Sequence, residues 1–171
     1  LLAVTLVAML GAPVLTAVFA PGFLEDDAKF ALASDMLRIT FPYLLLISLT
    51  AFAGGILNSY DRFAVPAFTP VLLNLAMIVA AIFLTPLMSE PVMALAWGVF
   101  IAGALQLFFQ LPFLMRLGLM PRPRVDYRHD GVSRILKLMM PALFGVSVSQ
   151  INLLLDTVLA SFLQTGSVSW L

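Results

Sequence analysis

The sequence predicts an all-α fold, a polytopic bundle of transmembrane helices. Of its 171 residues, 62% are hydrophobic and only 11% are charged, and the mean hydropathy is +1.07. A soluble fold of this size could not bury so much apolar surface, so we expect lipid to solvate part of it. Backbone polar groups in lipid must be paired internally, which leaves helices or closed barrels. The apolar runs are about 20 residues long, which favours helices over short alternating strands.

Five apolar segments are each long enough to cross a bilayer at about 1.5 Å per residue. They lie at about residues 1–19, 37–57, 67–84, 92–114 and 140–163. Short connections rich in turn-forming residues predict antiparallel neighbouring helices. We expect residues 1–171 to form a single membrane domain. Because the chain begins at Leu1 without an initiator methionine or a basic leader, we interpret it as an internal fragment of a longer protein.

An amphipathic helix is predicted at residues 130–139, just before the fifth segment. Apolar residues recur there at helical spacing, with Arg134 and Lys137 between them. This pattern is typical of a helix that lies in the membrane–water interface and leads into a span. It is equally compatible with a solvated helix start that carries positive charge, and neither interpretation assigns chemistry to the segment.

The distribution of lysine and arginine predicts the orientation of the segments in the membrane. The fourth connection and its flanks hold Arg116, Arg122, Arg124, Arg128, Arg134 and Lys137. The second connection holds Arg62, the third holds no basic residue, and the first is dominated by Glu25, Asp26 and Asp27. Connections two and four must lie on the same side of the membrane, and this bias predicts that both are cytoplasmic.

Composition also excludes several classes of function. The net charge is zero, which argues against a nucleic-acid partner. The chain has no cysteine, so it has neither disulfides nor thiolate metal sites, and its single histidine, His129, has no cysteine or histidine partner. No catalytic constellation or phosphate-binding loop can be assembled, so we expect neither enzymatic activity nor a cofactor.

Prolines and glycines interrupt the apolar pattern. Pro42 lies near the start of the second segment and Pro112 near the end of the fourth, and a proline inside a helix kinks it. Gly54 and Gly55 in the second segment allow close approach of a neighbouring helix. Packing is the simpler interpretation of these four residues, and the alternative is that they are hinges in a moving transporter.

The fifth segment carries two polar stripes at about 100° per residue. One holds Ser149, Asn152 and Asp156, and the other holds Gln150 with the hydroxyl residues at positions 147, 157 and 161. A helix with two polar stripes is expected to be enclosed by other helices or to line a water-filled cavity. We therefore take Ser149, Gln150, Asn152 and Asp156 as candidates for a substrate cavity or a coupling site.

Asp156 is the only carboxylate deep within a predicted segment. Intramembrane carboxylates are costly, and they serve as proton relays, cation ligands or counter-ions. The structural alternative is a hydrogen bond or ion pair with a helix outside this chain. For Gln150 and Asn152, interhelical hydrogen bonding is the simpler interpretation.

Several stretches of the sequence resemble the MurJ (MviN) family of lipid II flippases. They are RITFPYLLLIS at 38–48, ILNSYDRFAVPAFTP at 56–70, LAWG at 95–98, GVSVSQIN at 145–152 and GSVSW at 166–170. The resemblance covers essentially the whole chain and would place it at about the third to the seventh transmembrane helix of the family. It implies a fragment of a transporter of the multidrug/oligosaccharidyl-lipid/polysaccharide superfamily.

The resemblance also implies a function and partners. A member of this family moves an undecaprenyl-linked peptidoglycan precursor from the inner to the outer leaflet of the bacterial inner membrane by alternating access. The expected partners are this precursor, membrane lipids and the rest of the parent chain. The family's cavity arginines lie mainly on helices outside this chain, whereas its seventh helix borders the cavity. Some members place a carboxylate there in a sodium site, so the resemblance implies Asp156 as a sodium ligand, with coupling to sodium or protons.

Two rival functions remain open at this point. One is another transporter of the same superfamily, for lipid-linked oligosaccharides or drugs, which the cavity arginines of the missing helices would discriminate. The other is a non-transporting membrane scaffold, in which the polar residues of the fifth segment only join helices to one another.

Overall fold

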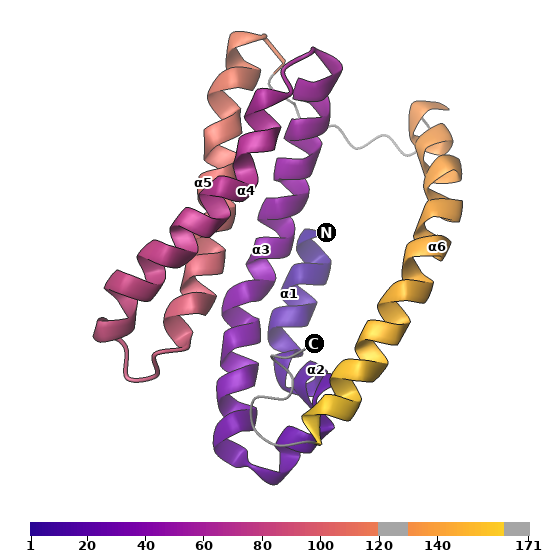
Figure 1. The fold of residues 1–171 in the computed structure, drawn as a ribbon. Coiled ribbons are helices and arrows are strands. Elements are labelled where there is room, and N and C mark those ends of the chain that lie inside the picture. The colour runs from indigo at the N-terminus through magenta and orange to yellow at the C-terminus, as the bar shows by residue number, and fades with distance from the viewer. Residues whose placement is uncertain (120–129, 163–171) are drawn as a thin grey trace. The chain divides into compact units, whose positions relative to one another are not determined.

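The computed structural model describes residues 1–119 and 130–162, apart from the side chains of Asp130, Val132, Ser149 and Ser161. All regular secondary structure in these residues is helical (Figure 1). The elements are α1 (Leu2–Leu10), α2 (Ala12–Phe19), η1 (Pro21–Glu25), α3 (Asp27–Ser59), α4 (Ala64–Val79), η2 (Ala80–Leu84), η3 (Thr85–Leu87), α5 (Met93–Arg116) and α6 (Asp130–Ser161). The predicted all-α fold is confirmed.

Four helical stretches of the described residues are long and apolar enough to cross a membrane, or five if a bent pair counts as one. The four are Asp27–Ser59, Ala64–Leu87, Met93–Arg116 and Ser133–Ala160. The second is α4 extended by the π-helical turn η2 and the short helix η3. The protein is therefore a polytopic helical membrane protein, as its composition predicts.

The bent pair is the first predicted apolar segment, which the structure divides into α1 and α2 at an angle of 76°. Gly11 lies between them, and its N–H donates to the carbonyl of Val7 at 2.8 Å. Pro13 explains the break, because a proline has no N–H and its ring excludes a straight helix through the preceding turn. Proline is tolerated near a helix start, so a new helix begins there.

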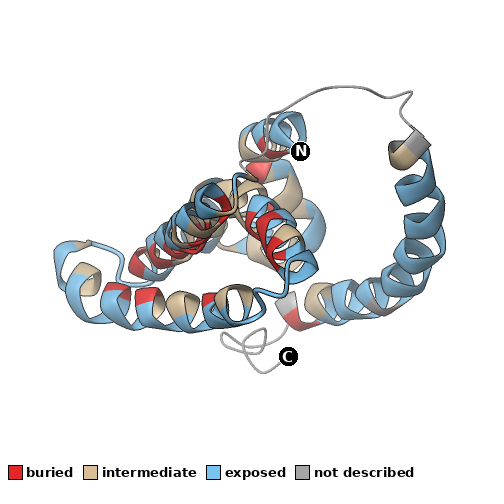
Figure 2. Ribbon diagram, turned by 90° about the horizontal axis from the view of Figure 1, so that it is seen from above, coloured by how far each residue is buried: buried red, intermediate tan, exposed pale blue. Residues whose placement is uncertain are grey.

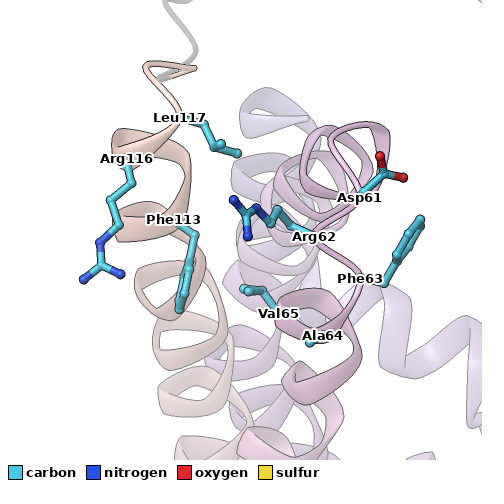
Figure 3. Close-up of a pocket in the computed structure, with 8 residues that line it drawn as sticks. All are labelled: Asp61, Arg62, Phe63, Ala64, Val65, Phe113, Arg116 and Leu117. Atoms are coloured by element: carbon cyan, nitrogen blue, oxygen red, sulfur yellow. The ribbon is translucent and has the colours of Figure 1, made fainter.

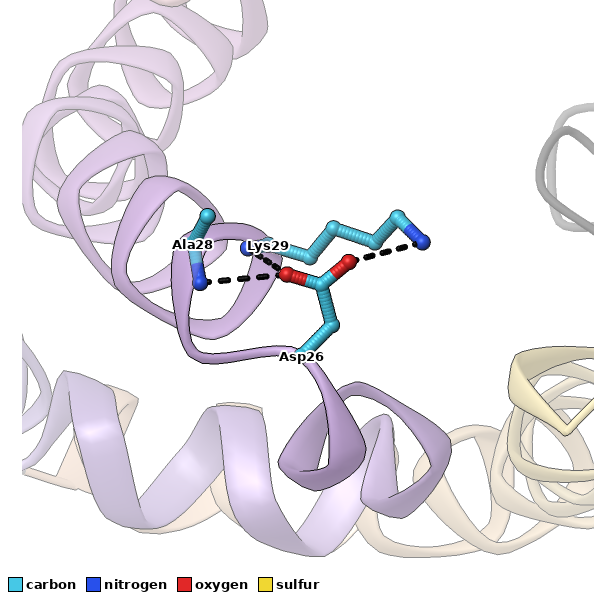
Figure 4. Close-up of polar contacts among 3 residues, drawn as sticks. All are labelled: Asp26, Ala28 and Lys29. Carbon is cyan, nitrogen blue, oxygen red and sulfur yellow. Dashed lines mark hydrogen bonds and ion pairs between the residues drawn. The ribbon is translucent and has the colours of Figure 1, made fainter.

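Asp26 begins the long helix α3 (Figure 4). One of its carboxylate oxygens, Oδ1, accepts hydrogen bonds from the backbone N–H groups of Ala28 and Lys29, each at 3.1 Å. The other, Oδ2, lies 3.0 Å from Nζ of Lys29. The side-chain contact from Lys29, followed by its backbone N–H, holds the pKa of Asp26 below its usual value. Asp26 thus satisfies backbone donors that a helix start would otherwise leave unpaired.

Residues Leu1–Leu15 and Ala31–Met120 form one compact unit. Within it, buried positions line the faces that α3, α4 and α5 turn toward one another (Figure 2). Ala53, Leu57 and Leu114 form a core cluster between α3 and α5, and Val65 of α4 packs against it. Phe68 of α4 and Phe109 of α5 add a ring contact with centroids 5.6 Å apart. Most other large apolar side chains remain exposed, as expected for surfaces that face lipid or further helices.

Close approach of α3 and α5 depends on Gly103. A Cβ atom added to this glycine would lie 2.6 Å from Cδ2 of Tyr43 and 3.1 Å from Cβ of Leu46. Distances this short require the tyrosine ring or the helix to move. Small residues at helix contacts are the usual solution in membranes, where helices associate largely through packing.

The second compact unit comprises residues 16–30 and 121–171, and its described elements include η1 and α6. The two elements contact each other. Residues 130–139, predicted as an amphipathic helix that leads into the fifth segment, form the first turns of α6, and their position in the membrane interface stays a prediction. No turn signal separates the two stretches, and Pro141 lies within the continuous helix. Arg122, Arg124 and Arg128, which contributed to the predicted orientation, lie outside the described residues.

Candidate functional site

The polar residues predicted to be functional all lie on α6. Gln150, Asn152 and Asp156 have exposed side chains, and no hydrogen bond or salt bridge joins them to another described residue. Ser149 is also in α6, but its side chain lies outside the described part of the structure. Asn152 and Asp156 are four residues apart, so they occupy the same face one turn from each other.

Two hydroxyl groups of the second stripe are satisfied by α6 itself. Ser147 Oγ donates to the carbonyl of Leu143 at 2.7 Å, and Thr157 Oγ1 donates to that of Leu153 at 2.8 Å. Such bonds let a hydroxyl face apolar surroundings without a further partner. The side chains of Gln150, Asn152 and Asp156 make no such hydrogen bond to a carbonyl of α6. They therefore require groups beyond α6, or water, wherever the helix crosses the membrane.

A metal role for Asp156 depends on further ligands. Among the described residues, no group of three or more His, Cys, Asp or Glu side chains could hold a metal ion. Sodium is a hard cation that takes oxygen ligands, and the Asn152 carboxamide is the oxygen donor one turn away on the same face. Asp156 thus fits a sodium site only as one ligand of a set that other parts of the protein complete.

A buried polar joint between α4 and α5 was not predicted. Gln106 is only 2% exposed, and its Nε2 donates to the backbone carbonyl of Thr69 at 2.9 Å. Thr69 is itself buried, and its Oγ1 donates to the carbonyl of Pro66 at 2.8 Å. That carbonyl would ordinarily bond the N–H four residues later, but position 70 is a proline. The threonine hydroxyl replaces the missing donor, and the glutamine ties this irregular turn to α5.

Gln110 continues the joint one turn along α5 and is 1% exposed. Its Oε1 would lie 3.7 Å from a Cβ added to Gly54 of α3, and Pro66 Cβ would lie 3.2 Å from the same atom. Gly54 therefore marks the point where α3, α4 and α5 meet. The Oε1 atoms of Gln106 and Gln110 are both buried and have no hydrogen-bond partner in the described part of the chain.

These two amide oxygens reduce the stability that the joint supplies, because each loses its hydrogen bonds to water and gains none from the described residues. The sequence signal for the joint was two glutamines four residues apart in an otherwise apolar segment. This signal is weaker than that of the fifth segment, which carries more polar residues.

The four predicted hinge or packing residues have different surroundings. Gly54 lies at the three-helix contact, whereas a Cβ added to Gly55 would meet nothing within 4 Å. Pro42 is half-buried inside α3, and Pro112 is exposed inside α5. Both helices continue through their prolines as single elements.

These features define a class of protein, a polytopic helical membrane protein with a polar joint inside its helix packing and, on α6, amide and carboxylate side chains that have no partner among the described residues. The chain belongs to the family described as lipid II flippase MurJ, whose family model matches residues 1–171. The resemblance seen in the motifs of the sequence is thereby confirmed.

Curated relatives agree with this membership. The chain is 54% identical over 175 residues to a probable lipid II flippase MurJ of Haemophilus influenzae, covering 98% of this chain and 34% of that protein. It is 51% identical to the protein of the same description in Vibrio cholerae, covering 98% and 33%. It is 46% identical to a lipid II flippase MurJ of Burkholderia cenocepacia, again covering 98% and 33%. The chain thus spans about a third of the length of these relatives.

Proposed function

We propose that this chain is part of a lipid II flippase that moves an undecaprenyl-linked peptidoglycan precursor from the inner to the outer leaflet of the bacterial inner membrane. Family membership and the names of the relatives support the substrate class. The structural observation that carries the proposal is the pair of polar stripes of α6, because Asn152 and Asp156 on one and Gln150 on the other lie on a helix otherwise apolar enough to span a membrane. Such stripes suit a helix that borders an aqueous path for a polar headgroup.

The α3–α4–α5 unit has a different role in this proposal. The contacts at Gly54 and Gly103 and the Gln106–Thr69 hydrogen bond join the three helices to one another. Interfaces of this kind resist continuous deformation, so the three helices move as one body during alternating access. When such a body moves relative to α6 in a transport cycle, the polar side chains of α6 meet different surroundings.

Asp156 is the coupling residue in this proposal, through sodium or a proton. Its support is that the carboxylate has no basic partner among the described residues, so an ion pair within them does not account for it. A carboxylate at this depth needs a cation, a proton or a partner from another part of the protein. Asp156→Asn keeps the size of the side chain and removes the charge that either coupling ion requires.

The test uses the full-length parent protein in cells depleted of their own flippase. We expect wild-type protein to restore growth and precursor export, and Asp156→Asn to change the dependence of export on sodium or on membrane potential. Thr157→Val is the matched control, because that hydroxyl is satisfied within α6 and its loss should leave export unchanged. A wild-type parent that reaches the membrane but does not support export would contradict the proposed function.

The non-transporting scaffold makes a different prediction for the same variants. In a scaffold, Asp156→Asn lowers stability and abundance but has no effect on export per folded molecule. Measuring abundance alongside export therefore separates the two functions, because only a transporter shows an altered ion dependence at constant abundance.

A further inference from the structure

The helices α3 and α5 end with the same capping arrangement. At the end of α3, the N–H of Arg62 donates to the carbonyl of Leu57 at 2.9 Å, and the N–H of Asp61 donates to that of Asn58 at 3.1 Å. At the end of α5, Leu119 and Gly118 donate to Leu114 and Met115 in the same pattern, each at 3.0 Å. This is the Schellman motif, which requires a left-handed residue directly after the helix.

The left-handed residue differs between the two caps. In α5 it is Gly118, with φ of 68°, as is usual. In α3 it is Asp61, with φ of 59°, the one described residue other than glycine with a positive φ. This conformation is strained for a residue with a side chain. It sends Asp61 to one side of the turn and Arg62 to the other, toward α5 (Figure 3).

The turn after α3, the start of α4 and the end of α5 line an open cavity of 390 Å³ (Figure 3). Its charged lining residues are Asp61, Arg62 and Arg116, and its apolar wall includes Phe113, Val65 and Leu117. The Arg116 guanidinium carbon lies 5.8 Å from the centroid of the Phe113 ring, a cation–π contact that leaves the N–H groups of the guanidinium free to donate. The cavity therefore combines two arginines and one carboxylate with an apolar wall, so the basic residues are in excess.

Neither arginine is neutralised within the described residues. The salt bridges found there join Lys29 to Asp26 and Arg38 to Asp35, and none reaches Arg62 or Arg116. The first residues of α4 add backbone N–H groups without a side-chain cap, since the residue that precedes the helix, Phe63, has no polar side chain. Two arginines and the start of α4 thus border one cavity, and Asp61, the carboxylate that also borders it, is turned to the other side of the α3–α4 turn from Arg62 (Figure 3).

We infer that this cavity binds the phosphate group of an anionic membrane lipid. Guanidinium groups bind phosphate oxygens through paired, charge-assisted hydrogen bonds, and uncapped helix N-termini favour the same anions. The cavity lies where three candidate spans end, α3 at Ser59, α4 at Ala64 and α5 at Arg116, which is the level of lipid headgroups. A lipid rather than a soluble phosphate fits the wall of Phe113, Val65 and Leu117, which would contact the glycerol and upper acyl region.

This site goes beyond the proposed transport function, because it lies at the ends of the α3–α4–α5 unit and includes no residue of the α6 stripes. A lipid held there would join the α3–α4 turn to the end of α5. We therefore expect bound lipid to stabilise the unit by mass action.

The experiment compares the full-length parent protein in lipid nanodiscs of phosphatidylcholine with and without phosphatidylglycerol. Retained lipid is counted by native mass spectrometry, and thermal unfolding is followed in parallel. We expect wild-type protein to retain phosphatidylglycerol in preference to phosphatidylcholine and to unfold at a higher temperature in its presence. The Arg62→Gln/Arg116→Gln variant should bind phosphatidylglycerol about tenfold more weakly or worse, because it loses charge-assisted hydrogen bonds.

Two further variants keep the test decisive. Arg38→Gln removes an arginine outside the cavity and should bind the lipid as wild type does. Arg62→Lys/Arg116→Lys keeps both charges without the paired donors, should fold if the glutamine variant does not, and should show intermediate binding.

The source of the phosphate is decided by adding inorganic phosphate to the protein in phosphatidylcholine nanodiscs. Equal stabilisation by inorganic phosphate, with displacement of phosphatidylglycerol, would overturn the lipid assignment. Unchanged phosphatidylglycerol binding in the glutamine variant, or an equal loss in Arg38→Gln, would overturn the site. Because binding is measured without transport, failure of this inference is distinguishable from failure of the proposed function.

Discussion

The side-chain amide of Gln106 donates to the backbone carbonyl of Thr69 across 2.9 Å, from one membrane helix to the next. The helix turn that it reaches is already irregular, because Pro70 supplies no N–H to the carbonyl of Pro66. The proline makes this turn of α4 irregular, and the glutamine of α5 holds the same turn by a hydrogen bond. The side-chain oxygen of Gln106 has no donor among the described residues, so only one end of its carboxamide is hydrogen-bonded.

Replacing Gln106 by methionine should change stability by no more than about 1 kcal/mol. The substitution removes one interhelical hydrogen bond, but it also removes a buried oxygen without a partner, and the two effects oppose each other. Gln106→Glu should cost about 2 kcal/mol or more, because the buried position would hold either a charge or a protonated acid. Thermal unfolding of the parent protein in detergent measures both. A methionine variant less stable than the glutamate variant would contradict this account.

Gly103→Val should destabilise the parent protein by about 1–3 kcal/mol, because the new side chain collides with Tyr43 and Leu46. The comparison is Gly55→Ala, where an added Cβ meets nothing within 4 Å in this chain and helix propensity improves by up to about 1 kcal/mol. Thermal unfolding again supplies the measurement. Strong destabilisation by Gly55→Ala would show that this position contacts a helix outside the chain.

Asp61→Gly should raise the stability of the α3–α4 turn by about 0.5–1 kcal/mol, because glycine adopts the left-handed conformation without strain. Gly118→Ala should have the opposite sign and a similar size, since it places a Cβ at the corresponding position of the α5 cap. Hydrogen exchange at the capping N–H groups of Arg62 and Leu119 would report each effect locally. Equal protection in wild type and Asp61→Gly would refute the proposed strain.

The cap of α3 should weaken in acid. The side-chain contact with Lys29, followed by the backbone hydrogen bonds, lowers the pKa of Asp26, so the ionised form is favoured in the folded protein. The resulting stabilisation is fully present above the usual pKa of 3.8 and is lost as the pH falls through the lower pKa of the folded state. As the pH falls through the folded-state pKa, the N–H groups of Ala28 and Lys29 should therefore exchange faster than the pH dependence of exchange in an unstructured peptide predicts.

Asp26→Asn is the control for this acid effect. The amide oxygen still accepts at the helix start, but it neither titrates nor pairs with Lys29. The acid-dependent part of the exchange should disappear in this variant. Persistence of the acid effect would assign it to another group.

Much of the fold could be predicted because the relevant signals are local. Long apolar runs separated by turn residues predict membrane helices wherever they occur, and the all-α class was confirmed on that basis. The break at Gly11 was also local, since Pro13 indicates a helix start, but the apolar run on both sides concealed it. The change in polarity at residues 130–139 is a local signal as well, and in the structure these residues and the fifth segment form one continuous helix.

The residues of the candidate site also differ in whether a local sequence signal reveals them. Asp156 could be found from the sequence because a carboxylate deep in an apolar segment is anomalous whatever surrounds it. Gln106 and Gln110 could not be recognised in that way, because the free-energy cost of a glutamine carboxamide depends on whether it faces a helix, water or lipid. The cavity between Arg62 and Arg116 joins residues more than fifty positions apart, and no local pattern relates them.

By itself, the sequence determined that the chain crosses a membrane as helices, where its helix-breaking residues lie and which family its motifs resemble. The tertiary structure alone decided what each of those residues contacts. Gly54 and Gly55 show the distinction, because they are neighbours in the chain with the same chemistry, yet only Gly54 lies against α4 and α5. The physical reason is that successive residues of a helix point about 100° apart, so the direction of the neighbouring helices, which depends on distant parts of the chain, decides which one is buried.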